Sequence, residues 1–371
     1  MQLSDLVTPQ VLIDQKRALR NIERAQEVAR AAGVRLRPHA KTHKSPVAAK
    51  WQIDRGAVGV CCAKLGEAEV FVEAGITDIR VPYPVNYINA SRLLALMDRA
   101  SMSIIVDHLH VARGWSAAMQ RADRVLDVLV KVDVGFHRCG IDPAGEPLEF
   151  LKKIKGLPGL RLRGILSHAG HSYLAASEAE LRAIALEEAS ILTGLRDRAA
   201  EAGIQIEELS VGATPLLRFA AEQRGITEVR AGNYIYFDRT QVALGSATLD
   251  DCALMVLATV VSKPAPDRII LDCGSKTLTN DQARGIDKVP GYGAILNADG
   301  TAIDEGLIIE RLSEEHATVR VIGATRLEPG SRVFVLPNHS CVVSNLVDEI
   351  VLVDGDQVLE RLPVAARGRI Q

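Results

Sequence analysis

The feature that most constrains the fold is a regular alternation of short β-branched runs with helix-length segments between residues 11 and 231. The intervening segments carry apolar residues on one face, which is typical of amphipathic helices. Strands separated by helices pair in parallel, and this many repeats favour a (β/α)8 TIM-type barrel. Nine strand-like runs occur, one more than a barrel needs, and we interpret the first, Val11-Leu12-Ile13, as a lead-in to the barrel.

The pattern changes after about residue 241. Short strand-like runs follow one another, separated by Gly, Pro and Asp turns, at 253–261, 268–272, 317–322, 331–336 and 349–353. No long helical pattern lies between them, so a second, mostly β domain is predicted. We divide the chain into a barrel over residues 10–240 and a β domain over residues 241–371, with which residues 1–9 could pack.

Composition and charge exclude several classes of partner. The formal net charge of -2 gives no electrostatic reason for binding nucleic acid or an anionic membrane. No apolar run reaches the ~18 residues of a membrane span, and the opening MQLSDLVTPQ lacks the basic and apolar regions of a signal peptide. Six cysteines in 371 residues do not suggest a disulfide framework. We expect a reduced, cytoplasmic protein whose partner is a small molecule.

The segment Arg37-Pro38-His39-Ala40-Lys41-Thr42-His43-Lys44 follows the second strand-like run. Ser45 and Pro46 come next and suit the start of a helix. Two lysines and two histidines therefore lie where a strand ends, and this is the rim at which barrels place their chemistry. The alternative is a solvated basic loop, and the residues alone leave both lysines as candidates.

Other polar and small residues follow later strands of the predicted barrel. Gly212-Ala213-Thr214, before a helix predicted to run from Thr214-Pro215 to about Gly225, and Gly232-Asn233-Tyr234 come where barrels often bind phosphate. A reactive lysine near a phosphate site indicates a pyridoxal phosphate Schiff base. The ring of His168 could stack on such a cofactor, and Arg138 could bind its phenolic oxygen. An ordinary structural histidine and a surface arginine are the alternatives.

The β domain contains Pro337-Asn338-His339-Ser340-Cys341. An imidazole and a thiol two residues apart on an extended segment would point the same way and could share one ion. Nitrogen and sulfur ligands together favour zinc. Two ligands alone are a weak signal, but they would leave coordination positions open for a substrate.

These motifs resemble those of the fold-type III pyridoxal phosphate enzymes of the D-threonine aldolase and D-serine dehydratase group, which are relatives of alanine racemase. The resemblance runs through nearly the whole chain, in RPHAKTHKSP (37–46), VCCAKLGEAE (60–69), VDVGFHRCG (132–140), AGNY (231–234), SKPAPDRIILDCGSK (262–276), LSEEHA (312–317) and PNHSC (337–341). So many motifs in the same order make the resemblance specific.

The resemblance implies a barrel that carries the cofactor, a C-terminal β domain and a homodimer with sites near the subunit interface. It selects Lys41, and not Lys44, as the Schiff-base lysine. It further implies the cofactor-binding residues Arg138, His168, Tyr173, Gly212, Thr214, Gly232, Asn233 and Tyr234, and the metal ligands His339 and Cys341. Aldolases of the group typically have His-x-Asp at the metal pair, whereas zinc-dependent D-serine dehydratases have His-x-Cys, as here.

We therefore expect a pyridoxal phosphate- and zinc-dependent dehydratase of 3-hydroxy-D-amino acids. The first alternative is a D-threonine-type aldolase that releases glycine and an aldehyde. An amino-acid racemase would need a second base, for which Tyr292 is a candidate. A non-catalytic pyridoxal phosphate-binding protein is the last alternative, and the second domain argues against it.

Overall fold

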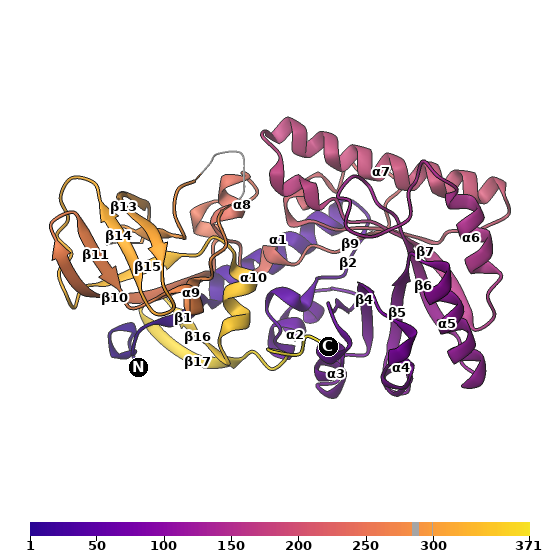
Figure 1. The fold of residues 1–371 in the computed structure, drawn as a ribbon, viewed down its shortest axis with the longest axis horizontal. Coiled ribbons are helices and arrows are strands. Elements are labelled where there is room, and N and C mark those ends of the chain that lie inside the picture. The colour runs from indigo at the N-terminus through magenta and orange to yellow at the C-terminus, as the bar shows by residue number, and fades with distance from the viewer. Residues whose placement is uncertain (284–288, 299) are drawn as a thin grey trace.

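The structure is a computed structural model that describes residues 1–283, 289–298 and 300–371. Its described residues form two sheets, which lie side by side in Figure 1 with the barrel on the right. The barrel sheet is parallel throughout, in the order β2-β9-β8-β7-β6-β5-β4-β3. Its strands are β2 (Arg35–Leu36), β3 (Val60–Cys61), β4 (Asp78–Pro84), β5 (Ser101–Val106), β6 (Leu126–Lys131), β7 (Leu160–Leu166), β8 (Glu208–Val211) and β9 (Glu228–Val229).

The barrel closes between β3 and the residues that follow β2, just before Lys41. His39 and Cys61 form a parallel bridge, and the Cys61 N–H donates to the carbonyl oxygen of Pro38 over 2.8 Å. This pairing fixes the backbone that leads directly into Lys41. The closure agrees with the (β/α)8 barrel expected from the alternation of the sequence.

Helices lie between the barrel strands, and their apolar faces pack on the strands as the periodicity predicts. The helices of this half are α1 (Gln15–Ala31), α2 (Pro46–Asp54), α3 (Leu65–Glu73), α4 (Ala90–Met97), α5 (Leu109–Arg121), α6 (Pro147–Lys155), α7 (Glu178–Glu201) and α8 (Arg239–Ala243). Short 3-10 helices at the rim are η2 (Ala40–Thr42), η4 (Gly170–Leu174), η5 (Thr214–Phe219) and η6 (Asn233–Ile235). The α-helix predicted after Thr214-Pro215 is wrong, because that segment forms only η5.

The second sheet has the order β11-β14-β13-β12-β15-β10-β1-β16-β17 and is antiparallel except for the β1–β16 pair. Its strands are β1 (Gln10–Asp14), β10 (Leu254–Ala265), β11 (Arg268–Leu271), β12 (Ala294–Leu296), β13 (Ile303–Leu312), β14 (Ala317–Val321), β15 (Arg332–Leu336), β16 (Glu349–Asp354) and β17 (Gln357–Pro363), and its short helices are α9 (Ser275–Leu278) and α10 (Ser340–Val343). The strands β12, β13 and β17 were not predicted from the sequence.

The first strand of the chain belongs to this second sheet. β1 pairs with β10 on one side and β16 on the other, as the interpretation of Val11-Leu12-Ile13 as a lead-in allows. The division at residue 10 therefore places β1 in the wrong half, since the chain enters the barrel only with α1. Asp14 ends β1 and caps α1 by accepting a hydrogen bond from the Arg17 N–H over 2.9 Å.

Candidate active site

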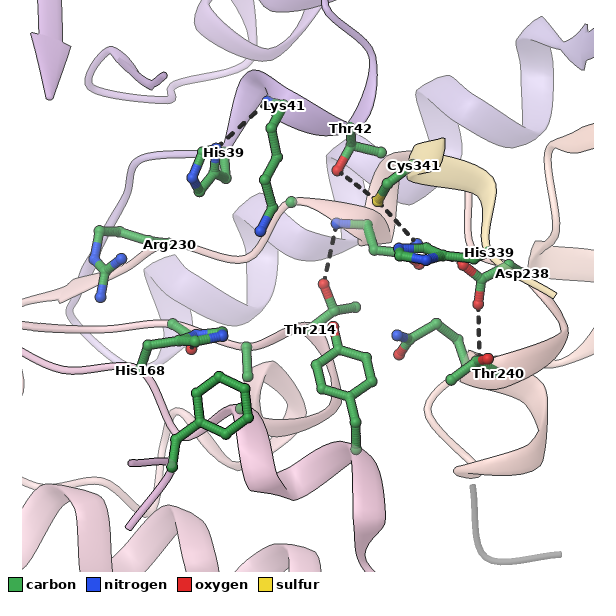
Figure 2. Close-up of a pocket in the computed structure, with 18 of the residues that line it drawn as sticks. His39, Lys41, Thr42, His168, Thr214, Arg230, Asp238, Thr240, His339 and Cys341 are labelled. Carbon is green, nitrogen blue, oxygen red and sulfur yellow. Dashed lines mark hydrogen bonds between the residues drawn. The ribbon is translucent and has the colours of Figure 1, made fainter. Parts of the chain in front are cut away.

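A cavity of about 270 Å³ lies where the carboxyl ends of the barrel strands meet the β domain. Parallel strands bring the segments that follow them to one rim, so residues distant in sequence converge there. The predicted site residues that line the cavity are Lys41, Arg138, His168, Tyr173, Gly212, Thr214, Gly232, Asn233, His339 and Cys341. Figure 2 shows Lys41 between the side chains of His168 and Arg230 and those of Cys341 and His339.

The two candidate lysines lie in different surroundings. Lys41 lies on η2 and lines the cavity, and its N–H is 3.4 Å from the Nδ1 atom of His39. Reduced contact with bulk water lowers the pKa of Lys41 below its ordinary value of 10.5, which favours a reactive neutral amine. Lys44 is instead buried and pairs with Glu67 over 3.1 Å, so its amine is engaged outside the cavity.

The Gly212–Thr214 and Gly232–Tyr234 segments form one wall of the cavity. In the described part of the chain, the backbone N–H groups of Gly212, Ala213 and Thr214 donate to no backbone or side-chain acceptor. The Thr214 hydroxyl accepts from the Asn233 N–H over 3.1 Å and ties the two segments together. A Cβ atom at Gly232 would lie only 2.8 Å from the carbonyl oxygen of His39, so this position has no room for a side chain.

The Tyr234 side chain does not line the cavity, unlike the other predicted site residues. It is fully buried, and its hydroxyl accepts a hydrogen bond from the Gln52 amide over 2.9 Å. Only the backbone of Tyr234 therefore remains available for the binding role expected from the sequence.

His168 and Arg230 form a second wall. The Nδ1 atom of His168 is hydrogen-bonded to the carbonyl oxygen of Gly212, which fixes the plane of the ring. Burial and the neighbouring lysines, Lys131 and Lys41, keep the pKa of His168 well below 6.5, so the ring is neutral. Arg230 is buried, and its Nε atom donates to the Ser210 hydroxyl over 2.7 Å.

Arg138 and Tyr173 lie on the barrel side of the cavity mouth. Arg138 is exposed, and its guanidinium carbon lies 5.0 Å from the centre of the Phe136 ring. Burial raises the pKa of Tyr173 above its ordinary value of 10.0, so its hydroxyl keeps its proton. Both residues carry hydrogen-bond donors into the cavity.

His339 and Cys341 meet at the opposite end from His168, as Figure 2 shows. The extended geometry expected for this pair is wrong: His339 is the residue just before α10, and Cys341 lies in that helical turn. Although partial burial opposes charge on both groups, their mutual hydrogen bond raises the pKa of His339 to about 10 and lowers that of Cys341. Cys341 also lies 3.2 Å from the Thr42 hydroxyl and 3.4 Å from the Asn233 amide nitrogen.

These residues fit the two groups that the sequence predicts. A neutral amine, unpaired backbone N–H groups and a neutral ring suit the aldehyde, phosphate and pyridine of pyridoxal phosphate. A nitrogen and a sulfur donor side by side suit zinc. No cluster of three or more His, Cys, Asp or Glu residues with metal-site geometry occurs among the described residues, so the pair would leave coordination positions open.

Sequence reasoning missed several residues of the cavity. Arg230 directly follows β9, and Lys131 is the last residue of β6. A search for charged residues at the ends of strands would have found both. Asp238, Gln241 and Asp281 also line the cavity, but no local pattern distinguishes them. Tyr292, considered as a second base, is not among the residues that line the cavity.

The described part of the chain contains no helix that is both long enough and apolar enough to cross a membrane.

The comparisons with known proteins agree with this geometry. Residues 13–240 match the model of the alanine racemase N-terminal domain, and residues 253–353 match that of a putative serine dehydratase domain. D-threo-3-hydroxyaspartate dehydratase of Delftia sp. (strain HT23) is 34% identical over 350 residues, covering 91% of this chain and 92% of the relative. D-threonine aldolase of Arthrobacter sp. is 34% identical over 371 residues, covering 99% and 94%.

The solved structure of the Delftia dehydratase superposes with a TM-score of 0.90 at 33% identity, covering 98% of this chain and 99% of that one. A cysteine-to-alanine variant of the same dehydratase, solved in a metal-free form, has a TM-score of 0.89. The chain therefore belongs to the alanine racemase-like family of pyridoxal phosphate enzymes, in the group of lyases that contains the D-serine dehydratases and D-threonine aldolases.

Proposed function

We propose that this protein is a pyridoxal phosphate- and zinc-dependent dehydratase of 3-hydroxy-D-amino acids, such as D-serine or D-threo-3-hydroxyaspartate. The observation that carries the proposal is the His339–Cys341 pair, which lines the same cavity as Lys41. Lys41 would act as the base at the α-carbon of the substrate. A metal ion held by His339 and Cys341 in the same cavity would bind the 3-hydroxyl. The similarity to the Delftia dehydratase supports this choice.

The cofactor would be held by backbone and side-chain groups that line the cavity. The unpaired N–H groups of Gly212, Ala213 and Thr214 would bind its phosphate, and the neutral ring of His168 would lie against its pyridine. Arg138 would bind its phenolic oxygen at the exposed edge. When bound, pyridoxal phosphate supplies an electron sink for the charge that develops at the substrate's α-carbon.

Lys41 has two roles in this proposal. It anchors the cofactor covalently, and its neutral amine is the base that takes the substrate's α-proton. The lowered pKa of Lys41 supports both roles, because each needs the unprotonated amine.

His339 and Cys341 would hold zinc through one nitrogen and one sulfur. Zinc supplies Lewis acidity, which makes the 3-hydroxyl a better leaving group. Loss of the α-proton and the 3-hydroxyl removes one water from the substrate. Hydrolysis of the resulting enamine restores one water and yields a 2-oxo acid and ammonia, so the overall reaction is balanced.

Product analysis tests the proposal. The purified protein, loaded with pyridoxal phosphate and zinc, is incubated with D-serine and with D-threo-3-hydroxyaspartate, and oxo acid and ammonia are measured in parallel. Equal amounts of both products from at least one substrate are expected, with L-serine as the control. Absence of oxo acid from both D-substrates, with and without zinc, would refute the dehydratase assignment.

A D-threonine-type aldolase is the second candidate, supported by the similarity to the Arthrobacter aldolase over 99% of this chain. On this alternative, a base removes the proton of the 3-hydroxyl and the bond between the α- and β-carbons breaks. Glycine and an aldehyde then appear in equal amounts. Incubation with D-threonine and D-phenylserine, followed by glycine measurement, separates this reaction from elimination.

A homodimer is also proposed. Its support is the family resemblance together with exposed apolar side chains on the barrel, of which Leu174 directly follows the cavity residue Tyr173 and Ile88 is 79% exposed. Sedimentation velocity with the cofactor-loaded protein tests it, since a monomer has a mass of 40.1 kDa. The cytoplasmic location stays a prediction from the sequence.

A further inference from the structure

Asp281 lies against the His339 ring at the edge of the cavity. Its Oδ2 atom is 2.6 Å from the Nδ1 atom of His339. Both residues line the cavity, and Figure 2 shows the His339 ring in contact with Cys341. The ring is thus held between a carboxylate and a thiol.

We propose that Asp281 is a positioning residue that fixes the orientation and tautomer of His339, so that Nε2 faces a metal ion shared with Cys341. The proposal rests on the metal site of the proposed function. A carboxylate that accepts a hydrogen bond from Nδ1 keeps the proton on that nitrogen. The lone pair for the ion is then on Nε2, and the ligand becomes more basic.

The surroundings of Asp281 support this role. Among the described residues, no lysine or arginine side chain lies within 4.0 Å of its carboxylate, so no cationic side chain competes with the His339 ring for it. Its carboxylate contacts Nδ1 of His339, and Asp281 belongs to no cluster with metal-site geometry among the described residues, so we place it behind the histidine and not on the ion. The carboxylate therefore acts on the metal only through His339.

The backbone of Asp281 is held from two sides. Its N–H donates to the Thr279 hydroxyl over 3.1 Å, and its carbonyl oxygen accepts from the Asn338 amide over 3.0 Å. The same Asn338 amide donates to the carbonyl oxygen of Gly291 over 2.9 Å. Asn338 is buried and directly precedes His339. Asn338 therefore holds the backbone of Asp281 close to the His339 ring.

Zinc affinity is the direct test. The cofactor-loaded protein and the variants Asp281→Asn and Asp281→Ala are stripped with a chelator and titrated with zinc chloride against a chromophoric chelator. We expect the zinc dissociation constant to rise 10- to 100-fold, about the effect of losing a carboxylate behind a metal-bound histidine. The matched control is Asp348→Asn, because Asp348 is an ion-paired carboxylate of the β domain that is exposed and does not line the cavity.

Two further measurements separate positioning from a structural role. Positioning predicts that the metal-free variants keep the melting temperature of the metal-free wild type, while the rise on adding zinc becomes smaller. It also predicts an unchanged absorbance of bound pyridoxal phosphate. A lower melting temperature of the metal-free variants, or loss of the cofactor, would overturn the proposal in favour of a structural role.

The outcomes also separate this proposal from the proposed function. If the wild type binds zinc and Asp281→Asn binds it equally well, the role of Asp281 is wrong and the zinc site stands. If the wild type binds no zinc, the metal requirement of the proposed function is wrong, and the positioning role is lost with it.

Discussion

Replacing Glu228 by glutamine should destabilise the barrel by about 3 kcal/mol at pH 7. Glu228 lies on β9 with its side chain fully buried inside the barrel. It accepts from Arg37 Nε over 2.9 Å and from the Ser210 hydroxyl over 2.6 Å, and it also pairs with Arg80. The variant therefore leaves two buried guanidinium groups without their shared carboxylate.

The magnitude follows from the ionisation of Glu228. Burial alone would raise its pKa, but Arg80 and Arg37 outweigh burial and hold the pKa at about 2, against an ordinary 4.5. A difference of this size corresponds to roughly 3 kcal/mol, and removing one partner of a buried ion pair costs about 3–5 kcal/mol. Because the folded pKa is the lower one, this stability is complete above pH 4.5 and is lost as the pH falls toward 2.

Urea unfolding followed by tryptophan fluorescence reports on the barrel, the part of the molecule that contains Glu228. The two tryptophans, Trp51 and Trp115, lie on α2 and α5 of the barrel. The control is Glu149→Gln, because Glu149 is half-exposed and pairs with Lys152 over 2.7 Å, an arrangement worth less than about 1 kcal/mol. Equal, small losses for both variants at pH 7, or a loss for Glu228→Gln that does not shrink in acid, would refute the reasoning.

Three further predictions concern the site. Lys41→Ala should abolish the visible absorbance of covalently bound cofactor after gel filtration, whereas Lys44→Met should retain it and lower the melting temperature of the barrel. Burial lowers the pKa of Lys131 to about 7 from 10.5, so the stability of the wild type should rise as the pH increases from 7 to 10.5. Melting curves of the cofactor-free Lys131→Met variant should lack this rise and show higher stability than the wild type near neutral pH. Gly232→Ala should weaken pyridoxal phosphate binding at least ~10-fold in equilibrium titrations because the cavity wall cannot admit a Cβ atom, whereas Gly194→Ala on α7, where nothing lies within 4 Å, should not.

The barrel could be predicted because its pattern is local. Alternation of strand and helix depends on residues close in sequence, and the carboxyl-end rule then brings the residues after each strand together. This is why Lys41, His168 and the Gly212–Thr214 segment were placed at one rim. The helix expected after Thr214 failed, because a cap signal shows only where a helix starts and not how far tertiary packing lets it run.

The rest of the site depends on contacts between distant segments. Asp281 meets His339 across 58 residues, and Asn233 meets Cys341 across 108. No local pattern marks such a pair, and Asp281 reads in the sequence as an ordinary turn residue. The strand β13 was missed for a related reason, since its mixed burial gives only a weak alternation of apolar and polar residues.

The barrel and the β domain are joined next to His339 and Cys341, at the carboxyl ends of the barrel strands. The Arg239 N–H donates to the carbonyl oxygen of Pro337 over 3.1 Å, and the Ser340 N–H donates to the Asp238 carboxylate over 3.0 Å. Residues on α8 and its cap thus hold both sides of His339. In the proposed function Lys41 acts at the α-carbon, where both elimination and aldol cleavage develop charge, so the His339–Cys341 pair is the part of the site that would separate the two reactions.

The variant Cys341→Asp tests whether the His339–Cys341 pair decides between elimination and aldol cleavage. The Thr42 hydroxyl and the Asn233 amide lie 3.2 and 3.4 Å from the Cys341 sulfur, and both can donate to a carboxylate placed there. An oxygen ligand in place of sulfur favours harder ions such as manganese over zinc. We expect the ratio of glycine to oxo acid from 3-hydroxy-D-amino acids to rise with manganese, while Cys341→Ala loses both products and keeps its bound cofactor. An unchanged product ratio in a metal-loaded Cys341→Asp variant would mean that residues of the barrel, and not the metal pair, choose the bond that breaks.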